Sequence, residues 1–184
     1  MLEKLLENIA KALEASGISY MVVGGQAVLL YGEPRLTKDI DITLDLGPES
    51  LEKLRAIIEN LCLKVLVRDV EDFVNKTFVL PALDEESGFR VDFIFSLSLY
   101  EKEAMQRVKI VKVGEAKVKF ASLEDLIIHK IIAFRPRDIE DIKNILLKNS
   151  DFDKEYILKW LKEFSQSLSE NFKERFEKVL EEIK

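Results

Sequence analysis

Apolar residues recur at helical spacing at the start of the chain and then alternate with polar residues through its middle. The first pattern predicts an N-terminal helix that ends near Gly17. The alternation predicts strands at residues 19–23, 38–44, 63–67, 74–80, 89–95, 109–113 and 116–120, separated by helices at 26–31, 49–61 and 100–107. From Ser122 onward the periodicity is helical, so we expect an α+β fold: a mixed β-sheet flanked by helices, followed by a C-terminal helical region.

Turn and cap signals divide the chain near residue 121. Gly114-Glu115 lies between two strand patterns and predicts a hairpin turn. Ser122 and Asp125 resemble a capping box at a helix start. We therefore expect an α/β catalytic domain over residues 1–121 and a helical C-terminal region over residues 122–184 that packs on it.

Two aspartates after a diglycine form the most informative pattern in the chain. Gly24-Gly25 ends an apolar run, and Asp39 and Asp41 follow within a β-branched segment. Because side chains alternate along a strand, both aspartates point to one face while Ile40 and Ile42 point to the other. Like charges on one side of a strand repel, and a divalent cation between them removes that cost. Carboxylates suit Mg²⁺ or Mn²⁺, so the pattern predicts a metal-dependent phosphoryl or nucleotidyl transfer site.

A third carboxylate is expected, because two metal ions carry more positive charge than one aspartate pair neutralises. Asp92 is the strongest candidate, since it lies in an otherwise apolar strand where a bare carboxylate is costly. The alternative is an edge-strand aspartate that pairs with Arg90 on the same face. We predict that Asp39, Asp41 and Asp92 are catalytic and bind the metal.

The residues around the diglycine are candidates for holding a nucleotide. Gly24, Gly25 and the following Gln26 allow the backbone and a helix N-terminus to approach a phosphate, whereas the alternative is a tight strand-to-helix turn. Arg35 and Thr37 precede the aspartates, where a cation suits triphosphate oxygens and a solvated loop is the alternative. Neither a dinucleotide-binding fingerprint nor a P-loop is present.

Lys130 lies on a helical face that is otherwise apolar, which is an unusual place for an ammonium. Either its side chain extends outward to solvent, or it reaches the site and contacts a phosphate or a metal-bound carboxylate. Arg137 is a candidate phosphate or acceptor ligand. Asp138 and Asp141 resemble a second capping box, with Asp138 as the N-cap.

Composition narrows the classes of function. The 184 residues include one cysteine and one histidine, which excludes an internal disulfide, paired-cysteine zinc motifs and histidine-rich metal sites. A net charge of −6 gives no overall basic footprint for nucleic acid. The N-terminus does not resemble a signal peptide and no apolar run suits a membrane span, so we expect a cytoplasmic protein without a membrane partner. Abundant Lys and Glu hint at a thermophilic source.

Together these residues resemble the nucleotidyltransferase fold that includes polymerase β and kanamycin nucleotidyltransferase. That signature, a hydrophobic residue, G-[GS], a spacer and D-h-[DE]-h, reads here as Val23-Gly24-Gly25, thirteen residues, and Asp39-Ile40-Asp41-Ile42. The strand that carries Asp92 resembles the strand of the third carboxylate in that superfamily. The resemblance implies a nucleotidyltransferase-like sheet, Mg²⁺ or Mn²⁺, and a nucleoside triphosphate.

A closer resemblance is to the AbiEii-type branch, known from abortive-infection and toxin–antitoxin systems, and to its prokaryotic relatives. Arg35 to Asp41 resembles the R-x-T-x-D-I-D motif of that branch. Lys130, Arg135-Pro136-Arg137-Asp138 and Asp141 resemble its K…R-x-R-D-x-x-D motif. This likeness implies that Lys130, as a catalytic residue, and Asp138 lie near the nucleotide, and that an antitoxin is a candidate partner. Larger toxins of the branch carry more C-terminal sequence than this chain.

We therefore expect a nucleotidyltransferase that moves a nucleoside monophosphate from a nucleoside triphosphate to an acceptor hydroxyl on RNA, protein or a small molecule. Two alternatives stay open. One is an inactive nucleotide-binding or toxin–antitoxin-type interaction module on the same fold, and the other is a structural cation site. Four aromatic residues are expected to form the C-terminal core or a homodimer interface: Trp160, Phe164, Phe172 and Phe176.

Overall fold

The computed structural model describes residues 1–34 and 36–183, and these fall into two compact units. Unit 1 comprises Met1–Gln26 and Thr37–Phe120. Unit 2 comprises Ala27–Leu36 and Ala121–Lys184. The division of the chain into domains at residue 121 stays a prediction.

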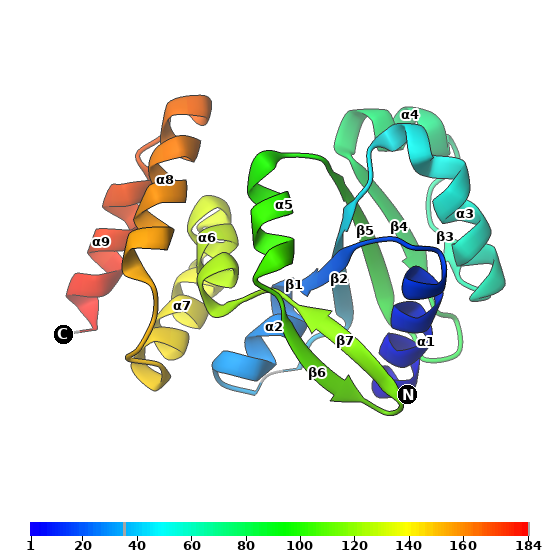
Figure 1. Ribbon diagram of the computed structural model, residues 1–184, viewed down its shortest axis with the longest axis horizontal. Coiled ribbons are helices and arrows are strands. Elements are labelled where there is room, and N and C mark those ends of the chain that lie inside the picture. The colour runs from blue at the N-terminus through cyan, green and yellow to red at the C-terminus, as the bar shows by residue number, and fades with distance from the viewer. Residues whose placement is uncertain (35, 184) are drawn as a thin grey trace. The chain divides into compact units, whose positions relative to one another are not determined.

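A mixed β-sheet organises unit 1 (Figure 1). In the described part of this unit, the strands lie in the order β3-β4-β5-β2-β1-β7-β6. The β2·β5 and β1·β7 pairs are parallel and the other pairs are antiparallel, so the predicted mixed sheet is confirmed. The strands are β1 (Tyr20–Val23), β2 (Asp39–Asp45), β3 (Lys64–Val65), β4 (Val79–Leu83), β5 (Arg90–Ser96), β6 (Lys109–Val113) and β7 (Ala116–Phe120).

The strand period of two separates an apolar face of the sheet from a polar one. Six side chains that alternate along β2 and β5 are almost fully buried, namely Ile40, Ile42, Leu44, Val91, Phe93 and Phe95. Asp39, Asp41, Arg90 and Asp92 occupy the intervening positions and therefore point to the opposite face. Burial of the apolar set fixes the register, because a slip of one residue would expose it and bury the charges.

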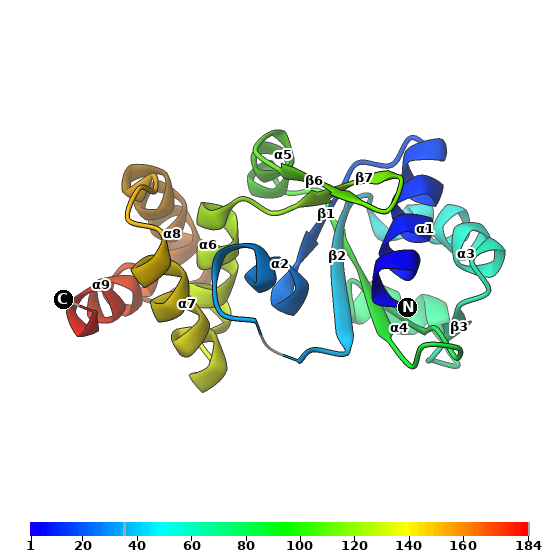
Figure 2. The same cartoon turned by 90° about the horizontal axis from the view of Figure 1, so that it is seen from below.

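Helices complete unit 1 (Figure 2). They are α1 (Leu2–Ala15), the start of α2 (Gly24–Tyr31), the 3₁₀ turn η1 (Pro48–Ser50), α3 (Leu51–Asn60), α4 (Val70–Thr77) and α5 (Leu99–Gln106). The amphipathic helix α1 buries Leu5, Ile9 and Leu13 and packs on β7.

The predicted strand at residues 74–80 is wrong in its first half. Residues Val70–Thr77 form α4, which ends where Phe78 adopts φ +58°, and β4 begins only at Val79. Asp72 and Lys76, four residues apart, form an ion pair along this helix at 2.7 Å. The β-branched residues within 74–80 favoured the prediction of a strand. The apolar residues Val70, Phe73 and Val74 have helical spacing, and this pattern decides the structure up to Thr77.

Unit 2 is helical and comprises the end of α2 with α6 (Leu123–Ala133), α7 (Pro136–Lys148), α8 (Lys154–Leu168) and α9 (Phe172–Glu182). Ser122 caps α6, as predicted, by accepting a hydrogen bond from the Asp125 backbone N–H at 3.1 Å. Phe172 and Phe176 are buried, as expected for core aromatics, whereas Trp160 and Phe164 are partly exposed.

Within the described residues, no helix combines the length and the apolar character that crossing a lipid bilayer requires.

Candidate metal and nucleotide site

Strand register brings the three predicted carboxylates together in unit 1. Asp41 of β2 lies directly opposite Asp92 of β5 in the parallel ladder, and Asp39 lies two residues before Asp41 on the same face. Residues directly opposite one another in neighbouring strands have adjacent side chains. The sequence alone did not show which strands are neighbours, so this pairing is the main geometric addition of the structure.

Arg90 enters this carboxylate face from the start of β5. It lies opposite Asp39, and its guanidinium Nε donates a hydrogen bond to Asp92 Oδ1 at 2.8 Å. The hydrogen bond to Asp92 raises the pKa of Arg90 despite partial desolvation, and the charges of Asp92, Asp39 and Asp41 act in the same direction. The Arg90–Asp92 pair expected in the alternative interpretation is therefore present, although β5 is an inner strand and not an edge.

The absence of side chains at Gly24 and Gly25 leaves room for Asp41 and Thr37 beside the backbone. Gly24 follows β1 with φ +62°, and a side chain there would collide with the carboxylate of Asp41. A Cβ at Gly25 would lie 2.8 Å from Thr37 Oγ1. Both positions therefore exclude side chains, because Asp41 of β2 and Thr37 from the loop before β2 approach the backbone closely.

Two further predicted nucleotide-binding residues lie beside the start of β2. The Gln26 amide is buried and donates a hydrogen bond to the Asp39 carbonyl oxygen at 3.4 Å. The Thr37 hydroxyl donates to the same oxygen at 3.4 Å. The Gln26 bond ties the diglycine turn to the strand that carries Asp39 and Asp41, whereas the Thr37 bond is local to the start of that strand. Arg35 lies outside the described residues.

The donor chemistry of Asp39, Asp41 and Asp92 fits Mg²⁺ or Mn²⁺, because all three offer carboxylate oxygens from one face of paired strands. Their side chains as placed do not form a ready metal cage. Among the described residues, no group of three or more His, Cys, Asp or Glu side chains is arranged to hold a metal ion. One oxygen of Asp92 is engaged by Arg90.

Lys130 belongs to unit 2 and is only 5% exposed, so of the two alternatives the one in which its side chain extends outward to solvent is wrong. Its Nζ donates to Asp138 Oδ1 at 3.0 Å and to Asp141 Oδ2 at 2.7 Å. Both carboxylates come from α7, so this buried triad joins α6 to α7. An unpaired charge would be costly at this depth, which explains why both acids face the ammonium.

The N-terminus of α7 differs from the predicted cap. The N-cap is Arg135, and Asp138 is the third helical residue, whose carboxylate accepts a hydrogen bond from the Arg135 backbone N–H at 3.2 Å. Burial opposes ionisation of Asp138 most strongly, but hydrogen bonds from Arg135 and Lys130 outweigh it and lower the pKa of Asp138. Arg137 is exposed in the first turn of the same helix. The roles of Lys130, Arg137 and Asp138 at a nucleotide stay predictions.

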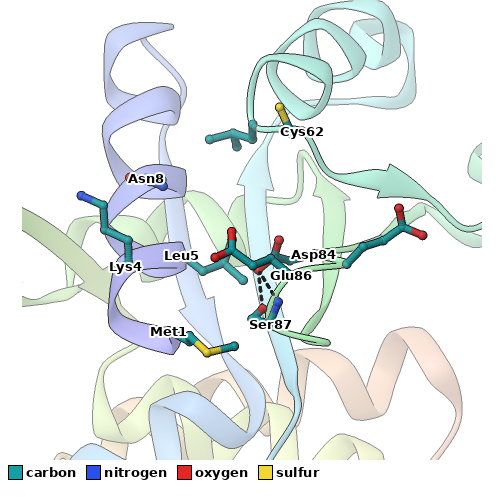
Figure 3. Close-up of a pocket in the computed structure, with 10 residues that line it drawn as sticks. Met1, Lys4, Leu5, Asn8, Cys62, Asp84, Glu86 and Ser87 are labelled. Atoms are coloured by element: carbon teal, nitrogen blue, oxygen red, sulfur yellow. Dashed lines mark hydrogen bonds between the residues drawn. The ribbon is translucent and has the colours of Figure 1, made fainter.

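A separate pocket of about 380 Å³ in unit 1 contains none of the predicted site residues (Figure 3). It lies between α1, the end of α3 and the turn before β5, where Asp84 Oδ2 accepts a hydrogen bond from the Ser87 backbone N–H at 3.3 Å. Acidic side chains dominate that turn, so the pocket is a poor candidate for binding phosphates.

Sequence reasoning treated Arg90 only as a partner of Asp92 and missed its place among all three carboxylates. A signal was available, because Arg90 and Asp92 are two residues apart in a strand and therefore share a face. The missing information was that Asp39 lies opposite Arg90, and this depends on the pairing of β2 with β5.

Comparison with known proteins agrees with this architecture. A family model described as "Nucleotidyltransferase of unknown function (DUF6036)" matches residues 1–184. No curated protein matches the chain. Membership of the AbiEii-type branch, a toxin–antitoxin role and a thermophilic source stay predictions.

Several solved structures are similar in fold. ANT(2")-Ia in complex with adenylyl-2"-tobramycin has a TM-score of 0.57 at 20% identity, over 95% of this chain and 98% of that one. An antigenic nucleotidyltransferase-like protein from Paracoccidioides brasiliensis has a TM-score of 0.58 at 16% identity, over 94% and 92%. Lincomycin-bound LnuA, a lincosamide antibiotic adenylyltransferase, has a TM-score of 0.53 at 19% identity, over 77% and 94%. At these identities the likeness shows a shared fold.

Proposed function

Because the chain belongs to the family described as nucleotidyltransferases of unknown function, we propose that it transfers a nucleoside monophosphate from a nucleoside triphosphate to an acceptor hydroxyl. The observation that supports this most is the register of β2 and β5, which sets Asp41 opposite Asp92 with Asp39 on the same face. We place the reaction in the cytoplasm, where nucleoside triphosphates and Mg²⁺ are abundant.

In this proposal Asp39, Asp41 and Asp92 hold Mg²⁺ or Mn²⁺. The bound cation supplies charge neutralisation for the triphosphate and the departing pyrophosphate. The acceptor oxygen forms a bond to the α-phosphorus while the bond from that phosphorus to the bridging oxygen of pyrophosphate breaks. Asp92 completes the site and helps to remove the proton from the acceptor hydroxyl.

The glycine turn provides the phosphate-binding part of the proposal. Gly24 and Gly25 begin α2, where backbone N–H groups without helical partners favour anions. Gln26 holds this turn against the start of β2 through the Asp39 carbonyl, and Thr37, which bonds the same carbonyl, lies close to Gly25. Their proposed contribution is to fix the distance between the phosphate-binding backbone and the carboxylates, which is the positioning that phosphoryl transfer depends on.

A transfer assay tests the proposal. The protein is incubated with each labelled nucleoside triphosphate, Mg²⁺ or Mn²⁺, and separate pools of RNA, protein and small molecules. Because two of the structural neighbours are seen with an adenylylated aminoglycoside and with lincomycin, both antibiotic classes belong in the small-molecule pool. Label transferred to one pool identifies the class of acceptor.

Matched variants make the assay specific to the carboxylate face. Asp39→Asn combined with Asp41→Asn should reduce transfer by about 100-fold or more, because charge stabilisation in the transition state is lost. Asp45→Asn is the control, since Asp45 lies on the same strand and face, four residues beyond Asp41. Transfer that survives the double substitution would overturn the proposal. Nucleotide binding without transfer to any pool would instead support the inactive nucleotide-binding module.

A further inference from the structure

Arg90 occupies an unusual position for a strand residue. It is the first residue of β5, lies opposite Asp39, and shares its face with Asp92. The Arg90 side chain is about half exposed, at 48%, whereas the side chain of Asp92, to which it donates, is 19% exposed. A half-exposed arginine side chain therefore bonds a carboxylate residue that is largely covered by protein.

The charges around Arg90 explain why it takes this position. Three carboxylates gathered on one face of two paired strands repel one another, and the repulsion increases where water is partly excluded. Arg90 is placed among these charges: its guanidinium Nε donates to Asp92 Oδ1 at 2.8 Å, the residue lies opposite Asp39 in the ladder, and Asp41 lies opposite Asp92. An arginine keeps its positive charge at every working pH, so this compensation is permanent in the metal-free protein.

We propose that Arg90 is a positioning residue that serves as the internal counter-cation of the carboxylate face and competes with the divalent cation for Asp92. The inference rests on the proposed function, because it assumes that the same carboxylates receive a metal ion. It adds a property of the site beyond transfer: Arg90 holds the empty site together and weakens binding of metal ions on their own.

Opposite effects on stability and affinity follow from this competition. With Arg90 present, the metal-free face has lower repulsion, but an incoming cation meets a fixed positive charge and a carboxylate oxygen that is already bonded. With Arg90 neutralised, the metal-free face is less stable and attracts a cation more strongly. Because metal binding and folding stability are thermodynamically linked, a substitution that destabilises only the metal-free protein increases the affinity for the metal by the same free energy.

A simple structural ion pair predicts a different result. If Arg90 only fastened β5 through Asp92, its loss would lower stability equally with and without metal. If Arg90 instead oriented Asp92 as a metal ligand, its loss would weaken metal binding, as happens when partners of metal ligands are removed. The sign of the change in metal affinity therefore separates competition from both other roles.

The test compares wild type, Arg90→Gln and Arg90→Lys by calorimetric titration with Mn²⁺ alone at low ionic strength. Competition predicts that Arg90→Gln binds Mn²⁺ roughly three- to tenfold more tightly, since one opposing charge is removed at short range. Arg90→Lys keeps the charge and should stay within about twofold of wild type. Arg55→Gln is the matched control, because Arg55 pairs with Glu52 on α3 and should leave Mn²⁺ binding unchanged.

Thermal unfolding in EDTA and in saturating Mn²⁺ provides a readout independent of activity. Arg90→Gln should melt below wild type in EDTA and show the larger rise when Mn²⁺ is added. Equal or weaker Mn²⁺ binding by Arg90→Gln would overturn the inference while leaving the metal-dependent function intact. Failure of both wild type and Arg90→Gln to bind Mn²⁺ would overturn the proposed metal site and the inference together.

Discussion

Gly24 shows how a single residue shapes the candidate site. Its φ of +62° is a backbone conformation that residues with a side chain rarely adopt, and the space for a side chain is filled by the Asp41 carboxylate. Gly17 has a similar φ of +66° but has no atom within 4 Å of a Cβ placed there. A substitution at Gly17 would therefore introduce backbone strain alone, whereas a substitution at Gly24 would add a collision with Asp41.

We expect Gly24→Ala to lower the free energy of unfolding by more than Gly17→Ala and also to weaken Mn²⁺ binding. Backbone strain alone costs about 1–3 kcal/mol at either position, whereas only the Gly24 substitution displaces Asp41. Urea denaturation measures the first effect and calorimetric titration the second. Equal stability loss in the two variants, with unchanged Mn²⁺ affinity in Gly24→Ala, would show that the position of Asp41 does not depend on the absence of a side chain at residue 24.

At the residue scale, sequence reasoning identified the types of residue but not their partners. The common face of Asp39 and Asp41 follows from the strand period and was predictable. That Gly24 makes room for Asp41 was not, because thirteen residues separate Gly25 from Asp39 and their approach depends on the pairing of β1 with β2.

At the scale of elements, the Lys130 triad connects two helices of unit 2. Lys130 lies in α6, and Asp138 and Asp141 lie in α7, on either side of the break at Pro136. Phe134 ends α6 with φ +46°, and the Arg175 guanidinium lies 5.0 Å from its ring centroid. The turn between the two helices is therefore held by an ionic contact inside and a cation–π contact beside it.

We expect Lys130→Met to lower the free energy of unfolding by about 3–5 kcal/mol, because it leaves two buried carboxylates without their shared cation. Lys178→Met is the matched control, since Lys178 forms an exposed pair with Glu174 along α9 and its loss should change stability little. Equilibrium denaturation at neutral pH measures both. A Lys130→Met protein as stable as the control would mean that the triad adds little to the packing of α6 on α7.

Element prediction succeeded where local signals agreed and failed where they competed. Strands 109–113 and 116–120 match β6 and β7 because alternation and the Gly114 turn indicate the same hairpin. Residues 74–77 form the end of α4 because the helical spacing of its apolar residues begins earlier, at Val70. The sequence did not predict the Lys130–Asp138–Asp141 triad, because Lys130 and Asp138 belong to separate helices. The spacing of apolar residues within each helix does not show how the two helices pack.

At the scale of the whole molecule, the family match spans both compact units, whereas the carboxylate face lies within unit 1 alone. The order of the signature residues along the chain was enough to predict the fold family. The sheet order, the Arg90 contact and the buried Lys130 triad needed tertiary structure, because each depends on elements that are distant in sequence.

The central claim is that Asp39, Asp41 and Asp92 share one metal site, and the anomalous difference map of a crystal soaked with Mn²⁺ and a non-hydrolysable nucleoside triphosphate tests it most directly. We predict a Mn²⁺ peak within about 2.5 Å of carboxylate oxygens from all three residues, with the triphosphate beside Gly24 and Gly25. A map that shows bound nucleotide with Mn²⁺ ligated elsewhere, or with any of the three carboxylates turned away from the ion, would contradict the account.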